Sequence, residues 1–400
     1  MTRTVFRGGD LFDGTGESIA AADVVVENGR FVEIGTGLDG EAEVDCSGKT
    51  LLPGLFDTHV HLTLSHINLW KHLQTPFSYR FYEAIHNLSA TVEAGITTVR
   101  DAGGADLGMK EAVQNGLVLG PRMQISLGML SQTGGHGDGW LPSGGEADLM
   151  PPYPGMPATV VDGPDEMRRA VRELVRAGAD VIKVATSGGV LSPRDEPTHA
   201  HFSREELEML VAEATAAGIW VMAHAQATDG IKNAIRAGIR SIDHGIYLDD
   251  EAIEMMIERG TYLVPTLIAP RGVTRAVEAG AQIPEASIRK AEEVVEVHRE
   301  SFRRAVDAGV KIAMGTDTGV TPHGENLMEL TLMVEGGMTP LEALTATTKT
   351  AAELMGLEAE LGSVESGKVA DLVIVGGDPF DFDTLGTRVE QVWMAGARVI

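Results

Sequence analysis

The chain contains very little cysteine, no long apolar run and a clear deficit of basic residues. Cys46 is the only cysteine among 400 residues, which excludes an internal disulfide and a metal site built from several thiolates. No apolar run approaches the roughly 18 residues that a membrane-spanning helix requires. The 32 basic against 58 acidic residues give a formal net charge of −26, which disfavours nucleic acid and anionic membranes as partners. Solubility is the simplest reason for such a charge.

The N-terminal residues also lack the apolar core of a secretory signal, so we expect a cytoplasmic protein. Hydrophobic residues make up 43% of the composition, which is enough to fill a sizeable core. A length of 400 residues accommodates either two average domains or one large α/β barrel with an appendage.

The two ends of the chain share a texture of short β-runs and turns. Near the N-terminus, Asn28-Gly29 separates two such runs, and Asn-Gly is a strong hairpin signal. Short strand-like runs return at residues 371–375 and 391–393. We therefore predict one small β-sandwich-like domain built from residues 1–54 and 366–400.

Between these ends, residues 55–365 alternate between strand-like and helix-like runs, which is typical of parallel strands joined by crossover helices. The apolar strand candidates are residues 52–58, 96–100, 122–128, 180–185, 219–224, 240–243, 261–267 and 310–316. Eight such units predict an α/β fold with a (β/α)8 TIM barrel, for which about 250 residues is usual. Several intervening helices end in Ala-Gly, where glycine supplies the left-handed residue that terminates a helix.

One connection is much longer than the others. Residues 129–163 follow the third predicted strand and are rich in glycine and proline. A loop of that length inside a compact domain is usually functional or disordered, and this one would lie over the face where barrel enzymes build their sites. We interpret it as a substrate loop or lid, with a plain insertion as the alternative.

Two histidines with i, i+2 spacing follow the first apolar run of the predicted barrel. His59 and His61 would project to the same face of a strand, so their imidazoles can hold one metal ion between them. An isolated His-x-His pair more often consists of surface or core histidines that bind no metal. Here, however, metal-ligand residue types recur at later strand ends. These are His224, His244 and Asp317, and all the strand ends of a barrel deliver residues to one common mouth.

Lys183 is an unusual member of this group because it lies inside an apolar strand candidate. Burial disfavours a charged amine, so such a lysine can lose its proton. The neutral amine can then react with CO2 to form a carbamate, an anion whose two oxygens can bridge two metal ions. A snorkelling or ion-paired lysine is the alternative.

These motifs resemble the amidohydrolase superfamily, and within it the imidazolonepropionase-like branch that contains Xaa-Pro dipeptidases. The resemblance rests on Leu-Pro-Gly-Leu-Phe-Asp-Thr-His-Val-His at residues 52–61, Val-Ile-Lys-Val-Ala-Thr-Ser-Gly-Gly at residues 181–189 and Gly-Thr-Asp at residues 315–317. It covers essentially the whole chain, including the return of the C-terminal segment into the β-domain.

The resemblance implies a binuclear metal centre with zinc as the expected ion. Six residues would hold the two ions: His59, His61 and Asp317 the first, His224 and His244 the second, and carbamylated Lys183 both. A hydroxide would also bridge the ions, which would polarise the scissile carbonyl. Asp317 would act as general acid/base, taking the proton of that hydroxide and passing it to the leaving amine.

Five further residues are candidates for contact with the substrate: His136, Gln226, His323, Arg194 and Arg271. As the resemblance implies, His136 on the long loop matches a loop histidine that contacts the substrate in related enzymes. The other candidates follow predicted strands, and a guanidinium there can fork onto a substrate carboxylate. For the loop histidines and arginines, an ordinary loop or surface role is the alternative. Gln226 stands where the proline-specific relatives have a tyrosine, which argues against proline specificity.

The sequence therefore predicts a metal-dependent amidohydrolase that cleaves an amide bond of a dipeptide or an N-acyl amino acid. We expect a small-molecule substrate and a homo-oligomeric assembly. The alternatives are a mononuclear deaminase or cyclic-amide hydrolase of the same superfamily, a hydrolase of a xenobiotic amide or carbamate, and a non-catalytic barrel. Lys183 argues against a mononuclear enzyme, and the complete ligand set argues against a non-catalytic protein.

Overall fold

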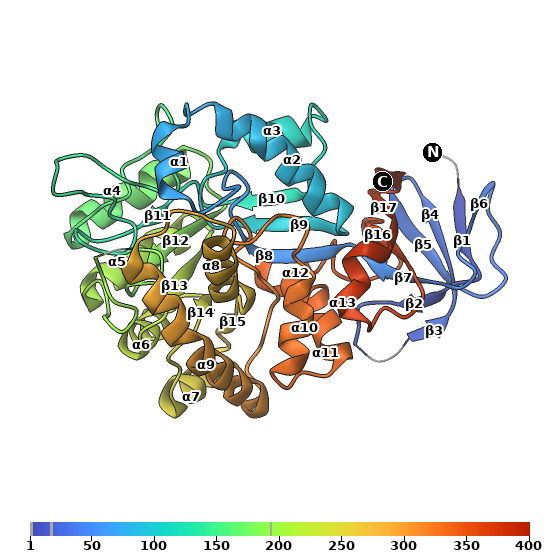
Figure 1. Cartoon of the computed structure of the whole chain (residues 1–400). Coiled ribbons are helices and arrows are strands. Elements are labelled where there is room, and N and C mark those ends of the chain that lie inside the picture. The colour runs from blue at the N-terminus through green and yellow to red at the C-terminus, as the bar shows by residue number, and fades with distance from the viewer. Residues whose placement is uncertain (1–2, 17–18, 193) are drawn as a thin grey trace.

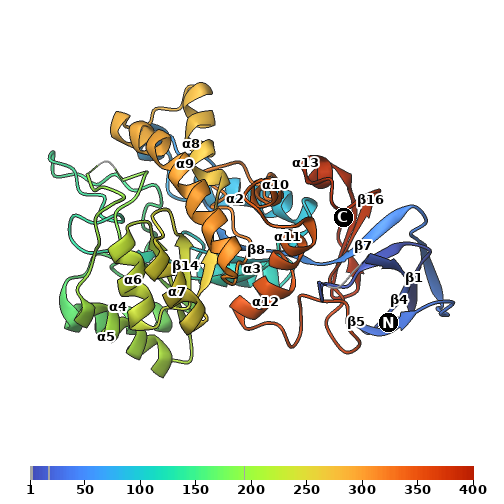
Figure 2. The same cartoon turned by 90° about the horizontal axis from the view of Figure 1, so that it is seen from below.

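The computed structural model describes residues 3–16, 19–192 and 194–400, which form a β-rich part and a larger α/β part (Figure 1). Both ends of the chain lie in the β-rich part, where the blue and red extremes of the colour scale meet. Figure 2 shows this part at one end of the molecule. The division of the chain at residues 54 and 366 stays a prediction.

Both ends of the chain contribute to one sheet of the β-rich part. The four-stranded sheet, in the order β5-β4-β1-β6, contains β1 (Thr4–Arg7), β4 (Asp23–Glu27), β5 (Arg30–Gly35) and β6 (Ala42–Asp45). The six-stranded sheet, in the order β18-β17-β16-β7-β2-β3, contains β2 (Asp10–Phe12), β3 (Ile19–Ala21), β7 (Lys49–Pro53), β16 (Leu372–Gly376), β17 (Val389–Met394) and β18 (Ala397–Arg398). Phe6, Phe31, Leu51 and Ile374 belong to one buried cluster, so the two ends share a core.

The α/β part contains two parallel sheets. The three-stranded sheet, in the order β10-β9-β8, contains β8 (Leu55–Val60), β9 (Ile96–Asp101) and β10 (Arg122–Ile125). The five-stranded sheet, in the order β11-β12-β13-β14-β15, contains β11 (Met129–Leu130), β12 (Val181–Ala185), β13 (Trp220–Ala225), β14 (Ser241–His244) and β15 (Tyr262–Val264). Every residue of β8, β9, β12 and β14 is buried, as expected for parallel strands covered by helices.

The predicted closed barrel of eight strands does not appear as one continuous ladder within the described residues. Segment 310–316, predicted as the last strand, is not a strand and is joined to the parallel sheets by isolated bridges. One bridge reaches Leu263 in β15, and another, just beyond the segment, reaches Val60 in β8. Between β10 and β11, Leu127 adopts a left-handed φ of 68°, a conformation that does not fit a strand. Both interruptions therefore lie between the two parallel sheets.

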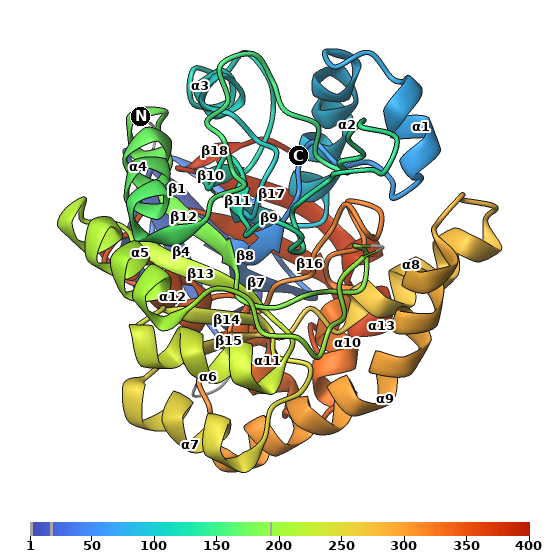
Figure 3. The ribbon, with the colours of Figure 1, turned by 90° about the vertical axis from the view of Figure 1, so that its left-hand side faces the viewer.

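Helices cover the outside of the parallel strands. In chain order they are α1 (Leu69–Gln74), α2 (Tyr79–Glu93), α3 (Leu107–Gln114), α4 (Gly163–Arg176), α5 (Arg204–Ala216), α6 (Thr228–Ala237), α7 (Asp250–Arg259), α8 (Ile268–Glu278), α9 (Glu285–Ala308), α10 (Met328–Glu335), α11 (Pro340–Ala346), α12 (Lys349–Met355) and α13 (Phe382–Leu385), followed by the short 3-10 helix η1 (Gly386–Arg388). Figure 3 shows α4 to α7 and α9 arranged around β12 to β15. No helix among the described residues is both long enough and apolar enough to cross a membrane.

The predicted helix terminators are confirmed. The five glycines predicted to end helices adopt a left-handed φ, from 75° at Gly218 to 99° at Gly178; they are Gly95, Gly178, Gly218, Gly238 and Gly309. Gly238 and Gly309 directly cap α6 and α9 and donate hydrogen bonds to carbonyls of the last turn. Glycine adopts this conformation without the steric cost that other residues meet.

The long segment between β11 and α4 closes on itself. Isolated bridges join Ser131 to Val160 and Trp140 to Glu146. Arg80 in α2 donates a hydrogen bond to the carbonyl oxygen of Pro151, which ties the segment to the neighbouring helix. The predicted substrate loop therefore has defined internal contacts, and many of its residues line the cavity described below.

Candidate functional site

The six residues predicted as metal ligands come from different strand ends and meet at one cavity. They are His59 in β8, His61 directly after β8, Lys183 in β12, His224 in β13, His244 at the end of β14 and Asp317 after segment 310–316. All six line a cavity of about 480 Å³. Residues that are far apart in the sequence share a wall here because the carboxyl ends of parallel strands face the same side.

Asp317 lies against the His-x-His pair. Its Oδ1 is 3.4 Å from His59 Nε2 and 3.1 Å from His61 Nε2. Ligand atoms of His59, His244 and Asp317 all lie within 4.8 Å of one another. The rings of His224 and His244 are also neighbours, with centroids 4.6 Å apart. Imidazole nitrogens and carboxylate oxygens at such spacing are a suitable donor set for a divalent transition metal.

The protonation of these groups also suits metal binding. Burial, reinforced by neighbouring histidines, holds the pKa values of His224 and His244 well below the usual range, so both rings are neutral. Burial opposes ionisation of Asp317, but His59 and His61 outweigh it and hold the pKa of Asp317 well below its usual value. His224 and His244 thus present neutral imidazoles and Asp317 a carboxylate, which are the forms that coordinate a cation.

Hydrogen bonds behind the site orient two of the rings. His61 Nδ1 is 2.9 Å from the carbonyl oxygen of Gly103, so this nitrogen donates and Nε2 is the nitrogen that faces Asp317. His244 Nδ1 is 2.7 Å from Thr266 Oγ1. Partners of this kind fix the tautomer and direction of a histidine that coordinates a metal.

Unusual backbone conformations deliver two of the side chains. His244 and Asp317 have φ values of 75° and 61°, which are uncommon for residues other than glycine. Such conformations persist only where the surrounding structure enforces them, and they cluster at functional sites. The local turn after each strand therefore aims these side chains at the cavity.

Lys183 is buried and forms an ion pair inside the site. Its side chain is 2% exposed, and its Nζ donates a hydrogen bond of 2.8 Å to Asp243 Oδ2. Burial lowers the pKa of Lys183, while Asp243 opposes that shift. The same Oδ2 atom of Asp243 is 2.9 Å from His59 Nδ1. Lys183 is therefore placed among the predicted metal ligands, and its carbamylation stays a prediction.

Sequence reasoning missed Asp243 and its partner Arg100. Arg100 lies in β9, is 3% exposed, and its guanidinium donates hydrogen bonds to Thr58 O (2.7 Å), Ser241 Oγ (3.1 Å) and Asp243 Oδ1 (3.3 Å). It thereby connects β8, β9 and β14. Its presence in an otherwise apolar strand candidate was the same signal that identified Lys183. Asp243 could have been recognised as the residue directly before His244.

Asp57 was also missed, and it joins β8 to the segment that carries Asp317. Its carboxylate accepts hydrogen bonds from the backbone N–H of His59 (3.1 Å), from Thr316 Oγ1 (2.6 Å) and from Asn326 Nδ2 (2.8 Å). Burial raises the pKa of Asp57 to about 6, although these donors work against the shift. The carboxylate thus holds two parts of the metal-ligand set together.

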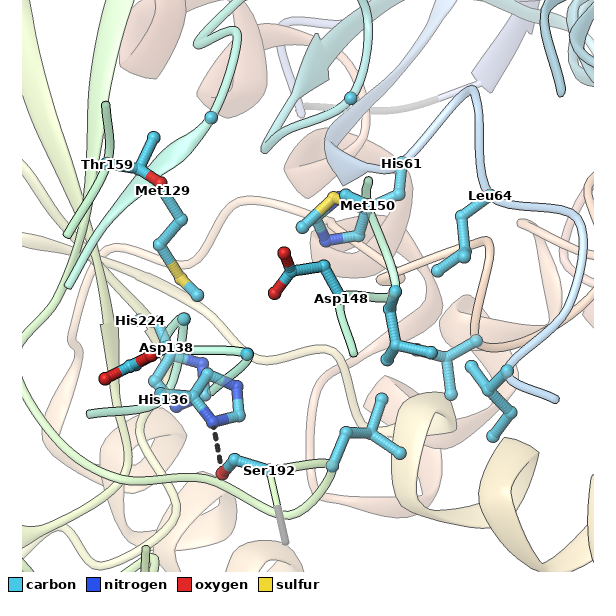
Figure 4. A pocket seen from close by; sticks show the side chains of 18 of the residues that line it. His61, Leu64, Met129, His136, Asp138, Asp148, Met150, Thr159, Ser192 and His224 are labelled. Carbon is cyan, nitrogen blue, oxygen red and sulfur yellow. Dashed lines mark hydrogen bonds between the residues drawn. The ribbon is translucent and has the colours of Figure 1, made fainter. Parts of the chain in front are cut away.

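His136 is placed in the cavity as predicted, from the long loop. Its ring stacks on His224, with centroids 4.1 Å apart and an interplanar angle of 17°, and Figure 4 shows the two rings together. His136 Nδ1 is 2.7 Å from Ser192 Oγ and 3.6 Å from an oxygen of Asp195. Residues after β12 therefore position this loop histidine.

Two further candidates also line the cavity. Gln226 is 4% exposed, and within the described residues its Oε1 has no hydrogen-bond partner, so it can interact with a ligand. The Arg194 guanidinium lies over the ring of Trp140, 5.0 Å from its centroid. Both residues belong to the lining.

The last two candidates lie elsewhere. Arg271 in α8 is about half exposed, does not line the cavity and approaches Glu335 to 3.5 Å. His323 does not line it either, because its Nε2 is 3.1 Å from the carbonyl oxygen of Leu64 and its Nδ1 faces Thr91. The rim position expected from sequence order was wrong for both, since a residue soon after a strand can point outward or under the adjoining loop.

Away from the histidines the cavity wall is largely apolar. Apolar and aromatic side chains from β11 and from two loops contribute: Leu64, Ile67, Met129, Leu149, Met150 and Tyr153. A mostly apolar cavity with a few convergent polar groups is the usual form of a site for a small organic molecule.

Comparison with known proteins gives consistent matches over the chain. The model of the amidohydrolase family matches residues 50–399. The sequence is 35% identical to ochratoxinase from Aspergillus niger in an alignment covering 98% of this chain and 86% of the relative. It is 26% identical to imidazolonepropionase from Geobacillus sp. (strain WCH70), covering 89% of this chain and 84% of the relative. Among solved structures, it is similar to an Xaa-Pro dipeptidase with methionine bound in the active site, with a TM-score of 0.90, 36% identity and 99% of both chains covered.

Proposed function

Because the chain belongs to the amidohydrolase family, we propose that it is a metal-dependent enzyme that hydrolyses an amide bond of a dipeptide or an N-acyl amino acid. The predicted resemblance to this family and to the branch of imidazolonepropionase and Xaa-Pro dipeptidase is confirmed. The family and its hydrolase relatives support hydrolysis of a carbon–nitrogen bond as the reaction class. The observation that carries the proposal is the convergence of four histidines, Asp317 and Lys183 on one cavity.

The donor set fits two divalent metal ions, with zinc as the expected metal. The proposed ligands are His59, His61 and Asp317 for one ion, His224 and His244 for the other, and carbamylated Lys183 for both. Neutral, buried imidazoles beside an ionised carboxylate support this assignment. When bound, such ions would make water nucleophilic at neutral pH and polarise a carbonyl oxygen.

The burial of the Lys183 amine supports the proposed carbamate. Burial favours the neutral form, and a neutral amine adds to CO2 with release of one proton to give a carbamate anion. The product would no longer donate as an ammonium to Asp243, whose charge Arg100 and Ser241 still balance through hydrogen bonds. This network supports a lysine that changes charge without leaving Asp243 unpaired.

Asp317 is the proposed proton carrier. Its carboxylate lies at the floor of the cavity beside both histidines of the His-x-His pair and stays ionised at neutral pH. It can therefore accept a proton from the attacking water and deliver it to the nitrogen of the leaving amine.

The proposed leaving group is an amino acid with a free carboxylate. Three residues that line the cavity offer hydrogen-bond donors for that carboxylate: His136, Gln226 and Arg194. As the family resemblance implies, Gln226 stands where proline-specific relatives have a tyrosine, so we propose that proline is not the preferred residue. The Xaa-Pro dipeptidase relative holds methionine in its active site, which supports a related pocket that admits a residue other than proline.

The test is hydrolysis of a library of dipeptides and N-acyl amino acids by the zinc-loaded enzyme, with each good substrate repeated as its C-terminal amide. We expect cleavage of the free acids and strong rejection of the amides, because donors left unpaired in the site cost affinity. Metal analysis should give about two ions per chain. Equal cleavage of acid and amide would disprove the carboxylate pocket, and a clear preference for Xaa-Pro would disprove the role of Gln226.

A further inference from the structure

The carboxylate of Asp148 faces the cavity from the long loop. Figure 4 shows the side chain of Asp148 in the middle of the pocket, between His61 and the stacked rings of His136 and His224. Within the described part of the chain, no hydrogen bond or ion pair engages Asp148, although the residue lines the cavity. It differs from the acidic groups at the metal site because it comes from the long loop between β11 and α4 and not from a strand end.

Asp138, in the same loop, is a carboxylate that does have hydrogen-bond partners. Asp138 accepts hydrogen bonds from the backbone N–H of Gly134 at 2.7 Å and from that of Trp140 at 3.0 Å. These contacts stabilise the loop, so the position of the Asp138 carboxylate is explained without any ligand. No comparable contact accounts for Asp148.

The surroundings of Asp148 make an unpaired charge costly. Met129, Met150 and Leu64 line the same cavity, and burial, reinforced by Glu146 and Asp138, raises the pKa of Asp148 to about 6. Among the described residues, no basic side chain offsets this shift. An unpaired carboxylate in a partly apolar cavity is destabilising unless a ligand brings the missing positive charge.

The loop is shaped to hold the carboxylate in this place. A Cβ added at Gly139 would lie 2.0 Å from Asp148 Oδ1, so a larger residue there would displace the carboxylate from its present place. The backbone N–H of Ala147 donates to the carbonyl oxygen of Gly139 at 2.8 Å, which fixes the two segments side by side. The position of Asp148 is therefore a built feature of the loop.

We propose that Asp148 binds the protonated α-amino group of the acyl residue, so that the substrate is a dipeptide with a free N-terminus rather than an N-acyl amino acid. This inference rests on the proposed function, since it assigns the acyl side of the same amide bond. In a dipeptide the ammonium group is attached to the carbon next to the scissile carbonyl. The donors on the His136 side and Asp148 would then hold opposite charges at the two ends of the substrate.

The experiment compares L-alanyl-L-leucine with propanoyl-L-leucine, which differ only in the amino group. Matched pairs with other leaving residues extend the comparison. We expect wild-type kcat/KM to favour the dipeptide by about 10- to 100-fold, the equivalent of one or two charge-assisted hydrogen bonds. Asp148→Asn should remove most of this preference by lowering kcat/KM for the dipeptide alone, with unchanged metal content.

Asp165→Asn is the matched control, because it makes the same substitution just beyond the loop, at a side chain that is 93% exposed and does not line the cavity. It should alter the preference by less than about threefold. Gly139→Ala offers a second test, because the added methyl group must displace the Asp148 carboxylate. It should reduce the preference as Asp148→Asn does.

The outcomes separate the two claims. Equal or better cleavage of propanoyl-L-leucine by the wild type, or an unchanged preference in Asp148→Asn, would overturn the role of Asp148 and leave amide hydrolysis standing. Failure to cleave any member of either series would instead overturn the proposed function on which the inference rests.

Discussion

The cavity has two walls that are built in different ways. The strand-end wall carries the six predicted metal ligands, and the loop wall is made of residues 129–160. Behind the strand-end wall, buried carboxylates accept hydrogen bonds from several elements. Asp57 joins β8 to the segment around Thr316, and Asp243 joins β14 to Arg100 in β9. On the loop wall, residues 129–160 form hydrogen bonds largely among themselves. There, Asp148 faces the cavity and has no hydrogen-bond or ion-pair partner in the described part of the chain.

This difference indicates that chemistry and substrate choice are supported by separate parts of the molecule. A buried polar network in which the members are paired favours one arrangement of its groups, as a metal centre requires. A loop whose contacts are mostly internal can change its cavity-facing residues without disturbing that centre. Changes on the strand-end wall should therefore affect turnover and metal content, and changes on the loop wall should affect preference.

The largest effect is expected from Asp317→Asn on the strand-end wall. The amide has nearly the same shape as the carboxylate but cannot accept a proton at neutral pH. We expect kcat to fall by about 10²- to 10⁴-fold, the usual value of general acid–base assistance, while the melting temperature changes little. Metal analysis of the same preparation shows whether an ion has been lost as well. A loss of activity below tenfold with both ions present would exclude Asp317 as the proton carrier.

Lys183→Ala should have the next largest effect. Without the bridging anion the second ion should bind weakly, so metal content should fall from about two ions toward one per chain. We expect activity to fall by about 100-fold, the upper range for loss of a group that supports a metal site. Bicarbonate should help zinc restore activity to metal-free wild-type enzyme but not to the variant. Two ions and near-normal turnover in Lys183→Ala would exclude the carbamate.

A second buried lysine can be compared with Lys183, because it supports the residues that position His136 and not the metal ligands. Lys290 in α9 is 1% exposed, and its Nζ donates to the carbonyl oxygens of Gly189 (2.7 Å), Ser192 (2.5 Å) and Asp195 (2.9 Å). It thereby holds the segment that positions His136.

Lys290→Met should leave the metal content unchanged but raise KM by about tenfold, because a displaced His136 weakens substrate binding. Buried carbonyls left without their donor should also lower the free energy of unfolding by at least about 1–3 kcal/mol. Loss of metal in this variant, with KM unchanged, would contradict the separation of the two walls.

The sequence allowed the strand-end wall to be predicted far better than the loop wall. Metal-ligand types at successive strand ends predicted which residues would meet at one cavity, because a parallel α/β fold brings the carboxyl ends of its strands together. Arg271 and His323 could not be placed in the same way, since the direction of a side chain beyond a strand depends on the local turn. The missing partner of Asp148 is a property of the folded loop, and the sequence of residues 129–163 contains no periodicity that reveals it.

Regularity also decided which parts of the fold could be predicted. Repeated Ala-Gly terminators and apolar runs gave the alternation of strands and helices, but not the interruptions at Leu127 and at segment 310–316. Both depend on backbone conformation, and apolar composition alone does not distinguish a strand from an extended segment held by isolated bridges.

The smallest predicted effect concerns Glu329, a fully buried carboxyl group in α10 that supports the strand-end wall. It accepts hydrogen bonds from the backbone N–H groups of Leu267 (2.7 Å) and Ile268 (2.8 Å), next to the Thr266 hydroxyl that contacts His244. Burial raises the pKa of Glu329 to about 8 from a value of 4.5; Asp57 adds to the shift, and the two N–H groups and Arg271 oppose it.

Between pH 4.5 and about 8, Glu329 is therefore protonated in the folded chain and ionised in the unfolded chain. The unfolded state binds fewer protons, so this group lowers the free energy of unfolding as the pH rises, by about 1.4 kcal/mol per pH unit at most. Glu329→Gln removes the titration but keeps an oxygen that can accept one hydrogen bond. The variant should therefore gain stability relative to the wild type between pH 5 and 8, as measured by urea unfolding at each pH. A stability difference that stays constant or falls with pH would show that Glu329 remains ionised in the fold, stabilised by the N-terminus of α8.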